Sequence, residues 1–138
     1  MMDVYTNWCG PCKMLDRNTF HNADVVDYVN KNYYAVKFNA EGNDVVTFKG
    51  NTFSNPNYKA ELANRRNSQH QLAQYFQVNA YPTIVFMDEK GELLAPVKGY
   101  KTPPQLELYL KMFKQDDHKS MDSQEKFNAY YEKFKPEF

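Results

Sequence analysis

The feature that most constrains this chain is a pair of cysteines, Cys9 and Cys12, at the point where an extended segment gives way to a helical one. The preceding residues, 1–6, are mostly apolar and β-prone, which predicts a buried strand. The following residues, 13–17, are good helix formers. The spacing of three places the second sulfur about one helical turn along the same face, close enough to bond to the first. We therefore expect two sulfurs that can join at the start of a helix.

Thiol–disulfide exchange is the chemistry that this arrangement favours. Cys9 would lie at the helix N-terminus, where unpaired N–H groups and the macrodipole stabilise a negative charge and lower the thiol pKa. The thiolate is the form of cysteine that attacks disulfides. Cys9 is thus expected to be the exposed nucleophile, and Cys12 the shielded sulfur that resolves a mixed disulfide. Pro11 falls in the first helical turn, where its missing N–H costs least, and stiffens the loop between the sulfurs.

Two other interpretations of the cysteine pair carry less weight. The pair could be half of a metal site, but His21, His70 and His118 are scattered and none has ligand spacing. A purely structural disulfide that closes so short a loop would add little stability. We therefore expect no metal and no organic cofactor.

Composition narrows the class of protein further. The chain has 138 residues, which fits one domain with a real core. Aromatic residues make up 16%, which argues against disorder. The 17 Lys and Arg residues balance 17 Asp and Glu residues, so the bulk attraction for nucleic acid or anionic lipid is missing. No apolar run approaches the roughly 20 residues of a membrane helix. Neither nucleic acid nor a membrane span is expected.

The rest of the chain predicts alternating strands and helices. Strands are expected at 33–39, 83–87 and 92–97, the last two forming a hairpin, and a small hairpin is expected within 45–54. Helices are expected at 23–30, 55–63, 68–76, 103–113 and from 122 onward. Their predicted N-caps are Asn22, Asn55, Ser68, Thr102 and Asp122. This order predicts an α/β sandwich with a mixed sheet.

The segment Trp8-Cys9-Gly10-Pro11-Cys12-Lys13 resembles the active-site motif of the thioredoxin family. Further positions match that family in order along residues 3 to about 113. They are Asp3, Lys37, the Tyr81-Pro82-Thr83 loop, Phe86, the turn at Gly91-Glu92, and Gly99. The resemblance implies a thioredoxin-like fold with a mixed central sheet flanked by helices.

The resemblance also implies roles for individual residues. Asp3 would be buried near Cys12 and help to deprotonate it through water, with Lys37 as its partner; the alternative is an ordinary aspartate at the surface start of a strand. Pro82 would be cis, stack on the disulfide and exclude metal. Tyr81 would offer its backbone groups to an extended substrate. The other substrate-binding candidates are Trp8, Gly10, Pro11 and Gly99.

The sequence departs from the family pattern in several places. The usual first strand and helix are absent, and residues 42–67 form an insertion. Tyr81 replaces a smaller aliphatic residue and should alter which substrates dock. A C-terminal helix is added, whose aromatic stripe would fill the gap left by the missing elements, pack beside helix 103–113, or contact a second molecule. The stripe consists of Phe127, Tyr130, Tyr131 and Phe134. We expect a thioredoxin-like domain at 1–115 and a helical extension at 116–138 packed on it.

The expected function is a thiol–disulfide oxidoreductase that reduces protein disulfides, because Gly-Pro between the sulfurs is the dipeptide of reducing thioredoxins. The alternatives are a disulfide isomerase or oxidase of an exported relay, and a non-enzymatic interaction module. The expected partners are disulfide-containing protein substrates and an upstream reductase, with the chain a monomer or dimer. A cytoplasmic location follows if Met1 is the true start, and a periplasmic or exported one if a leader is missing.

Overall fold

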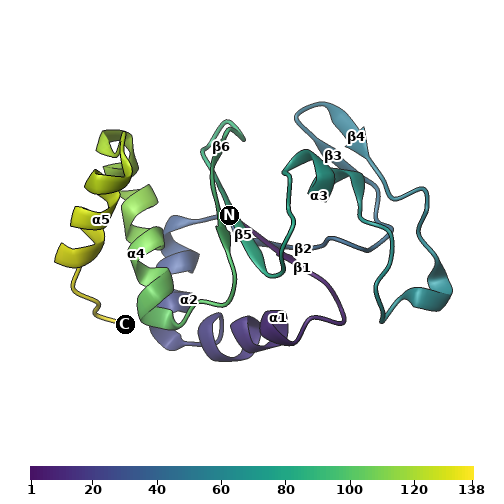
Figure 1. The fold of residues 1–138 in the computed structure, drawn as a ribbon, viewed down its shortest axis with the longest axis horizontal. Helices are drawn as coiled ribbons and strands as arrows, with labels where there is room; N and C mark the ends of the chain where they lie inside the picture. Colours follow the sequence, from purple (N-terminus) through teal and green to yellow (C-terminus); the bar gives the residue numbers. More distant parts are fainter. The chain divides into compact units, whose positions relative to one another are not determined.

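The computed structural model describes residues 1–138 (Figure 1). They divide into two compact units. Residues 1–14 and 35–100 form the first, called here the sheet unit, and residues 15–34 and 101–138 form the second, the helical unit. No helix in the structure combines the length and the apolar content that crossing a membrane requires. The predicted division into 1–115 and 116–138 stays a prediction.

The sheet unit is built on four strands in the order β2-β1-β5-β6. They are β1 (Met2–Tyr5), β2 (Val36–Asn39), β5 (Thr83–Met87) and β6 (Leu93–Lys98). β1 runs parallel to β2 and antiparallel to β5, and β5 pairs antiparallel with β6. The central strands are apolar and buried on both faces, as Val4, Ile84 and Val85 show. The predicted α/β fold with a mixed sheet, flanking helices and an added C-terminal helix is confirmed.

The predicted insertion, residues 42–67, contains the predicted small hairpin, formed by β3 (Val46–Phe48) and β4 (Asn51–Phe53). Both turn residues, Lys49 and Gly50, have positive φ angles, which matches the right-handed twist of the flanking strands. Phe48 and Phe53 pack against the apolar core that includes Leu72 of α3 (Gln71–Tyr75). Figure 1 shows this hairpin beside α3. The insertion is therefore fastened to the sheet unit by apolar contact.

The helix predicted at 55–63 is wrong, since only a single 3₁₀ turn, η2 (Ala60–Leu62), forms there. The side chain of Asn55 is buried and does not cap. Its Nδ2 donates to the carbonyls of Gly42 (2.9 Å) and Ser68 (2.8 Å), and its Oδ1 accepts from Ser68 Oγ (2.6 Å). Long-range hydrogen bonds have taken the groups that a local cap would use.

Three other boundaries differ from the prediction. Ser68 is engaged by Asn55, so His70 caps α3 instead, accepting from Leu72 N–H at 3.0 Å. Strand β2 starts at Val36 and not at residue 33, because Tyr33 still closes the preceding helix. Ser123, not Asp122, caps the last helix, accepting from Lys126 N–H at 3.2 Å.

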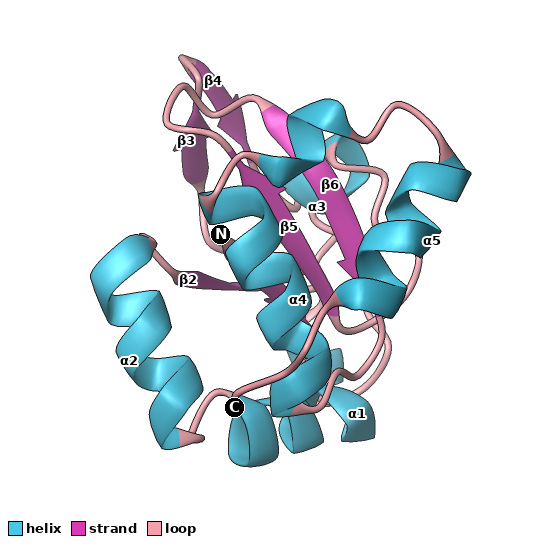
Figure 2. Ribbon diagram, turned by 90° about the vertical axis from the view of Figure 1, so that its left-hand side faces the viewer, coloured by secondary structure: helices cyan, strands magenta, loops and turns pink.

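The helical unit contains the longer helices. They are α2 (Ala23–Asn32), α4 (Pro103–Lys114) and α5 (Gln124–Lys133), with a 3₁₀ turn η3 (Asp117–Ser120) before α5. α4 lies between α2 and α5 (Figure 2). The predicted cap residues Asn22 and Thr102 begin α2 and α4. Residues 15–19 form a π-helical turn, η1 (Leu15–Thr19), directly after α1 (Gly10–Met14) of the sheet unit.

The aromatic stripe of α5 packs beside α4, the second of the three placements considered. Phe127 stacks on Tyr109 of α4 with ring centroids 6.3 Å apart. Tyr130 donates its hydroxyl to Asp117 Oδ2 at 3.0 Å, while Tyr131 stays 58% exposed. α5 is thus held to its own unit by one aromatic stack and one polar contact.

Candidate active site

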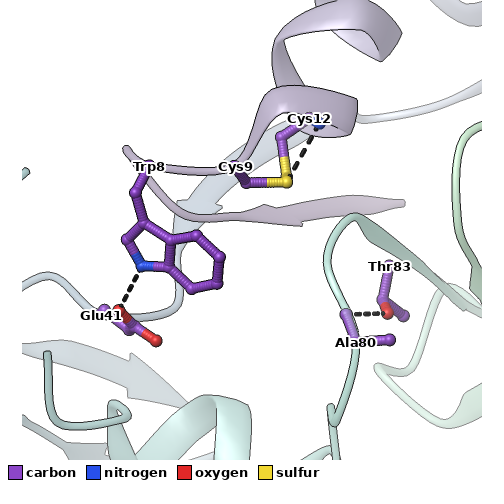
Figure 3. Close-up of a disulfide and its surroundings, with 6 residues drawn as sticks. All are labelled: Trp8, Cys9, Cys12, Glu41, Ala80 and Thr83. Carbon is purple, nitrogen blue, oxygen red and sulfur yellow. Dashed lines mark hydrogen bonds between the residues drawn. A yellow bond between two sulfur atoms is a disulfide. The ribbon is translucent and has the colours of Figure 1, made fainter. Parts of the chain in front are cut away.

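The two cysteines form a disulfide at the start of α1 (Figure 3). Cys9 immediately precedes the helix and Cys12 lies within it, with their Cα atoms 5.3 Å apart. The backbone N–H of Cys12 donates to Cys9 Sγ at 3.1 Å. The prediction that both sulfurs lie within bonding distance at a helix start is therefore confirmed.

The predicted difference in exposure between the two cysteines is wrong for this oxidised form. Cys9 is only 3% exposed and Cys12 only 6%. The intervening Gly10 and Pro11 are exposed. The two cysteines nevertheless differ in access, since Cys9 lines an open cleft and Cys12 does not.

The cleft beside Cys9 has a volume of about 450 Å³ and lies wholly within the sheet unit. Residues 8–11 of the active-site turn form one wall, and residues 79–81 form another. The remaining lining side chains are Glu41, which follows β2, and Arg66, from the end of the insertion. The cleft thus brings together four stretches that are far apart in the sequence.

Trp8 is fixed in this cleft by polar and aromatic contacts. Its indole Nε1–H donates to Glu41 Oε1 at 2.7 Å, as Figure 3 shows. Its ring meets that of Tyr81 edge to face, with centroids 6.0 Å apart. The guanidinium of Arg66 lies over the same indole, 5.1 Å from the ring centroid. Trp8 therefore contacts two other residues that line the cleft, Tyr81 and Arg66.

The loop before β5 has the cis-proline that the resemblance implies, since the Tyr81–Pro82 bond is cis. The Pro82 carbonyl accepts from Gly99 N–H at 2.8 Å, and Gly99 has a φ of 88°, a conformation that favours glycine. Thr83 Oγ1 donates to the Ala80 carbonyl at 2.7 Å (Figure 3). These bonds hold the loop on both sides of Pro82.

The side chain of Tyr81 is half-buried in the sheet unit. Burial raises the pKa of its phenol, and the hydrogen bond from Gln69 partly offsets this. Gln69 Nε2 donates to the phenol oxygen at 3.0 Å and to the Val78 carbonyl at 2.8 Å. The phenol is thus neutral at physiological pH and held in place.

Asp3 and Lys37 lie opposite each other on the parallel strands β1 and β2. Asp3 is 5% exposed, as the resemblance implies and unlike the surface aspartate of the alternative interpretation. Lys37 is exposed, with its ammonium 4.8 Å from the ring centroid of Tyr5. The predicted role of this pair in deprotonating Cys12 stays a prediction.

Two charged residues of the cleft, Glu41 and Arg66, are not among the predicted site residues. Glu41 could have been found, because β1 and β2 are parallel and their carboxyl ends meet at one edge of the sheet. The turn after β1 carries Cys9, so the turn after β2 has to lie near it. Arg66 offers no such signal, since it reaches the cleft from the end of an irregular insertion.

The buried histidine of this unit has a structural role. His70 Nδ1 accepts from Leu72 N–H, so its Nε2–H is the donor to the Asp44 carbonyl at 2.6 Å. Its ring also packs edge to face on Phe38. Both ring nitrogens are therefore committed to the fold. No group of three or more His, Cys, Asp or Glu side chains gathers as a metal-binding cluster.

Comparison with known proteins agrees with this geometry. Residues 1–114 match a family model described as "Thioredoxin-like domain". The chain is 25% identical over 115 residues to the thiol:disulfide interchange protein DsbD of Pectobacterium atrosepticum. That alignment covers 82% of this chain but only 16% of the length of the relative. A solved thioredoxin-fold protein from Helicobacter pylori has the same fold, with a TM-score of 0.69 at 20% identity, over 95% of this chain and 80% of its own.

Proposed function

The chain belongs to the thioredoxin-like domain family, and on that premise we propose that it is a thiol–disulfide oxidoreductase whose net direction is the reduction of protein disulfides. The observation that carries the proposal is the Cys9–Cys12 disulfide, of which Cys9 lines an open cleft. The similarity to a thiol:disulfide interchange protein supports the same chemistry.

The reaction begins from the dithiol form. The Cys9 thiolate attacks one sulfur of the substrate disulfide, and the other substrate sulfur leaves as a thiolate that takes up a proton. Cys12 then loses its proton and attacks Cys9 Sγ, which releases the second substrate thiol and forms the Cys9–Cys12 disulfide. Two electrons and two protons pass from the cysteine pair to the substrate. A partner dithiol reductase restores the pair by the reverse exchange.

Residues around the sulfurs support each step of this scheme. The Cys12 N–H that now donates to Cys9 Sγ can stabilise negative charge on that sulfur. Of the two cysteines, only Cys9 lines the cleft, so its sulfur is the one that an incoming disulfide meets. We assign proton acceptance from Cys12 to buried Asp3, and backbone pairing with an extended substrate to Tyr81.

The reducing direction rests on the Gly10-Pro11 dipeptide. A reductase should have a potential near the value of about −270 mV found for thioredoxin, whereas a strong oxidant lies near about −120 mV. Equilibration with glutathione or dithiothreitol measures this quantity. A potential at the oxidising end would instead favour the isomerase or oxidase alternative.

Insulin reduction in the presence of dithiothreitol tests the activity itself. Cys9→Ser should abolish it, because the nucleophile is lost, and Asn51→Ser on the exposed hairpin is the control. Cys12→Ser should accumulate a covalent adduct between Cys9 and the substrate, visible by mass spectrometry, because the resolving step is blocked. An inactive wild type, together with no adduct in Cys12→Ser, would contradict the proposal and favour a non-enzymatic interaction module.

A further inference from the structure

Arg66 occupies an unusual position at the candidate active site. Its guanidinium lies over the Trp8 indole, 5.1 Å from the ring centroid, and lines the same cleft as Cys9. Beyond that stacking contact, no hydrogen bond or ion pair engages the guanidinium in the structure. The cleft therefore contains a cation that is held by its face, with the N–H groups at its edge unused.

The backbone on either side of Arg66 is held in place. Glu41 Oε1, the oxygen that accepts from Trp8 Nε1–H, also accepts the backbone N–H of Asn67 at 2.8 Å. The Asn67 side chain in turn bonds the backbone of Lys59 twice, accepting from its N–H at 3.1 Å and donating to its carbonyl at 2.8 Å. One carboxylate thus sets the positions of both the indole and the residue that follows Arg66.

A second contact fastens the insertion to the active-site turn. Asn7, two residues before Cys9, donates its Nδ2 to the carbonyl of Ala63 at 3.0 Å. The stretch from Ala63 to Asn67 is therefore tied at one end to Asn7 and at the other to Glu41, the partner of Trp8. Arg66 is presented to the cleft by this tether.

We propose that Arg66 forms a subsite for an acidic side chain adjacent to the reacting cysteine of a substrate polypeptide, an inference that rests on the proposed function. A guanidinium stacked on an aromatic ring keeps its edge free for a two-point hydrogen bond with a carboxylate. Stacking also fixes the guanidinium plane, so less rotamer freedom is lost on binding. Glu41, the other charged residue of the cleft, already accepts two N–H groups through Oε1 and repels a substrate carboxylate away from its own side, toward Arg66.

The test uses three disulfide-bonded peptides that differ only in the residue beside the reacting cysteine, which is Asp, Asn or Lys. The reduced protein should reduce the Asp peptide with a kcat/KM about two- to fivefold above that of the Lys peptide, the range of an exposed charged pair. The preference should shrink as salt is added, because exposed charges are screened.

The decisive variants are Arg66→Ala, Arg66→Glu and the control Arg65→Ala. Arg65 is the adjacent exposed arginine and does not line the cleft. Arg66→Ala should remove the preference and Arg66→Glu should invert it, while Arg65→Ala keeps the wild-type ratio. The Asn peptide has no charge beside the reacting cysteine, so the Asp-to-Asn and Lys-to-Asn rate ratios within each variant measure selectivity independently of that variant's overall activity.

Two results would overturn the inference in distinguishable ways. If Arg66→Ala keeps the wild-type ratio of the Asp-peptide rate to the Lys-peptide rate, Arg66 is not a selectivity residue, although the exchange activity stands. If the wild type reduces none of the three peptides, the proposed function fails and the subsite fails with it.

Discussion

Two glutamates, one in each unit, hold a later stretch of chain by accepting its backbone N–H groups. In the sheet unit, Glu41 accepts from Asn67 at 2.8 Å. In the helical unit, Glu107 of α4 accepts from Glu137 at 2.8 Å and from Phe138 at 2.9 Å. The same device therefore fastens the active-site insertion in one unit and the last residues of the chain in the other.

The two carboxylates differ in burial, and this difference sets the number of partners that each requires. Glu107 is fully buried and takes a third partner, the ammonium of Lys111 at 2.6 Å. Lys111 also lies 3.4 Å from Glu137 and over the ring of Phe138. A buried charge is costly unless it is paired, whereas a partly solvated one is not. Glu41 is only partly buried, so it can accept hydrogen bonds from Trp8 and Asn67 in the cleft without a cationic partner.

Replacing Glu107 should have the largest effect on stability. Glu107→Ala leaves two N–H groups and a mostly buried ammonium without their acceptor, and should cost about 3–5 kcal/mol of unfolding free energy. Denaturant unfolding measures this, with Glu132→Ala on the exposed face of α5 as control. A cost near that of the control would mean that the tail is not held by Glu107.

The corresponding change at Glu41 should cost less unfolding free energy than Glu107→Ala, and it should alter the packing of the cleft. Glu41→Ala removes two hydrogen bonds from a partly solvated acceptor, which predicts a loss of about 1–2 kcal/mol. Glu41→Gln keeps an acceptor oxygen and should cost less still. Trp8 is the only tryptophan, so its fluorescence reports directly on this contact. Unchanged emission in Glu41→Ala would contradict the role of Glu41 in fixing the indole.

The elements recognised from sequence are those whose signals are local. Short β-prone runs joined by a turn located β5 and β6, helical spacing located α4, and the cysteine spacing located the disulfide, because neighbouring residues carry all of that information. The pairing of Asn55 with Ser68 defeated two cap predictions, because it depends on a contact across 13 residues. Arg66 reaches Trp8 across a longer separation, through tethers that no local pattern encodes.

The next largest effect should appear at alkaline pH, where the two units should lose stability over different pH ranges. Burial alone lowers the pKa of Lys111, but its hydrogen bond to Glu107 and the charges of Glu107 and Glu137 outweigh this and raise it. Burial, with the hydrogen bond to Asp117, raises the pKa of Tyr130 to about 12 from its ordinary value of 10.0. A raised folded-state pKa gives stability that is complete below the unfolded pKa and is lost as the pH rises through the folded one.

The contribution of Tyr130 should therefore be lost between about pH 10 and 12. More groups with a raised pKa lie in the helical unit than in the sheet unit, so the helical unit should lose structure first. Those of the helical unit are Tyr28, Tyr33, Tyr109, Lys111 and Tyr130, and those of the sheet unit are Lys49 and Tyr81. Amide NMR signals assigned to α4 and β5 can follow the two units separately as the pH rises. In Tyr130→Phe, the share of the pH-dependent loss of stability that this phenol causes should disappear. Simultaneous loss of both sets of signals in every variant would contradict the comparison.

The smallest effect should come from an ion pair in the same unit that is nearly as close but exposed. Lys126 of α5 and Asp122, two residues before that helix, lie 2.9 Å apart, with side chains 58% and 76% exposed. A double-mutant cycle with Lys126→Ala and Asp122→Ala should give a coupling below about 0.5 kcal/mol, because water screens both charges. The same cycle at Lys111 and Glu107, 2.6 Å apart, should give several times more. Equal couplings would mean that burial does not set the worth of these charges, and the contrast between Glu41 and Glu107 would then need another cause.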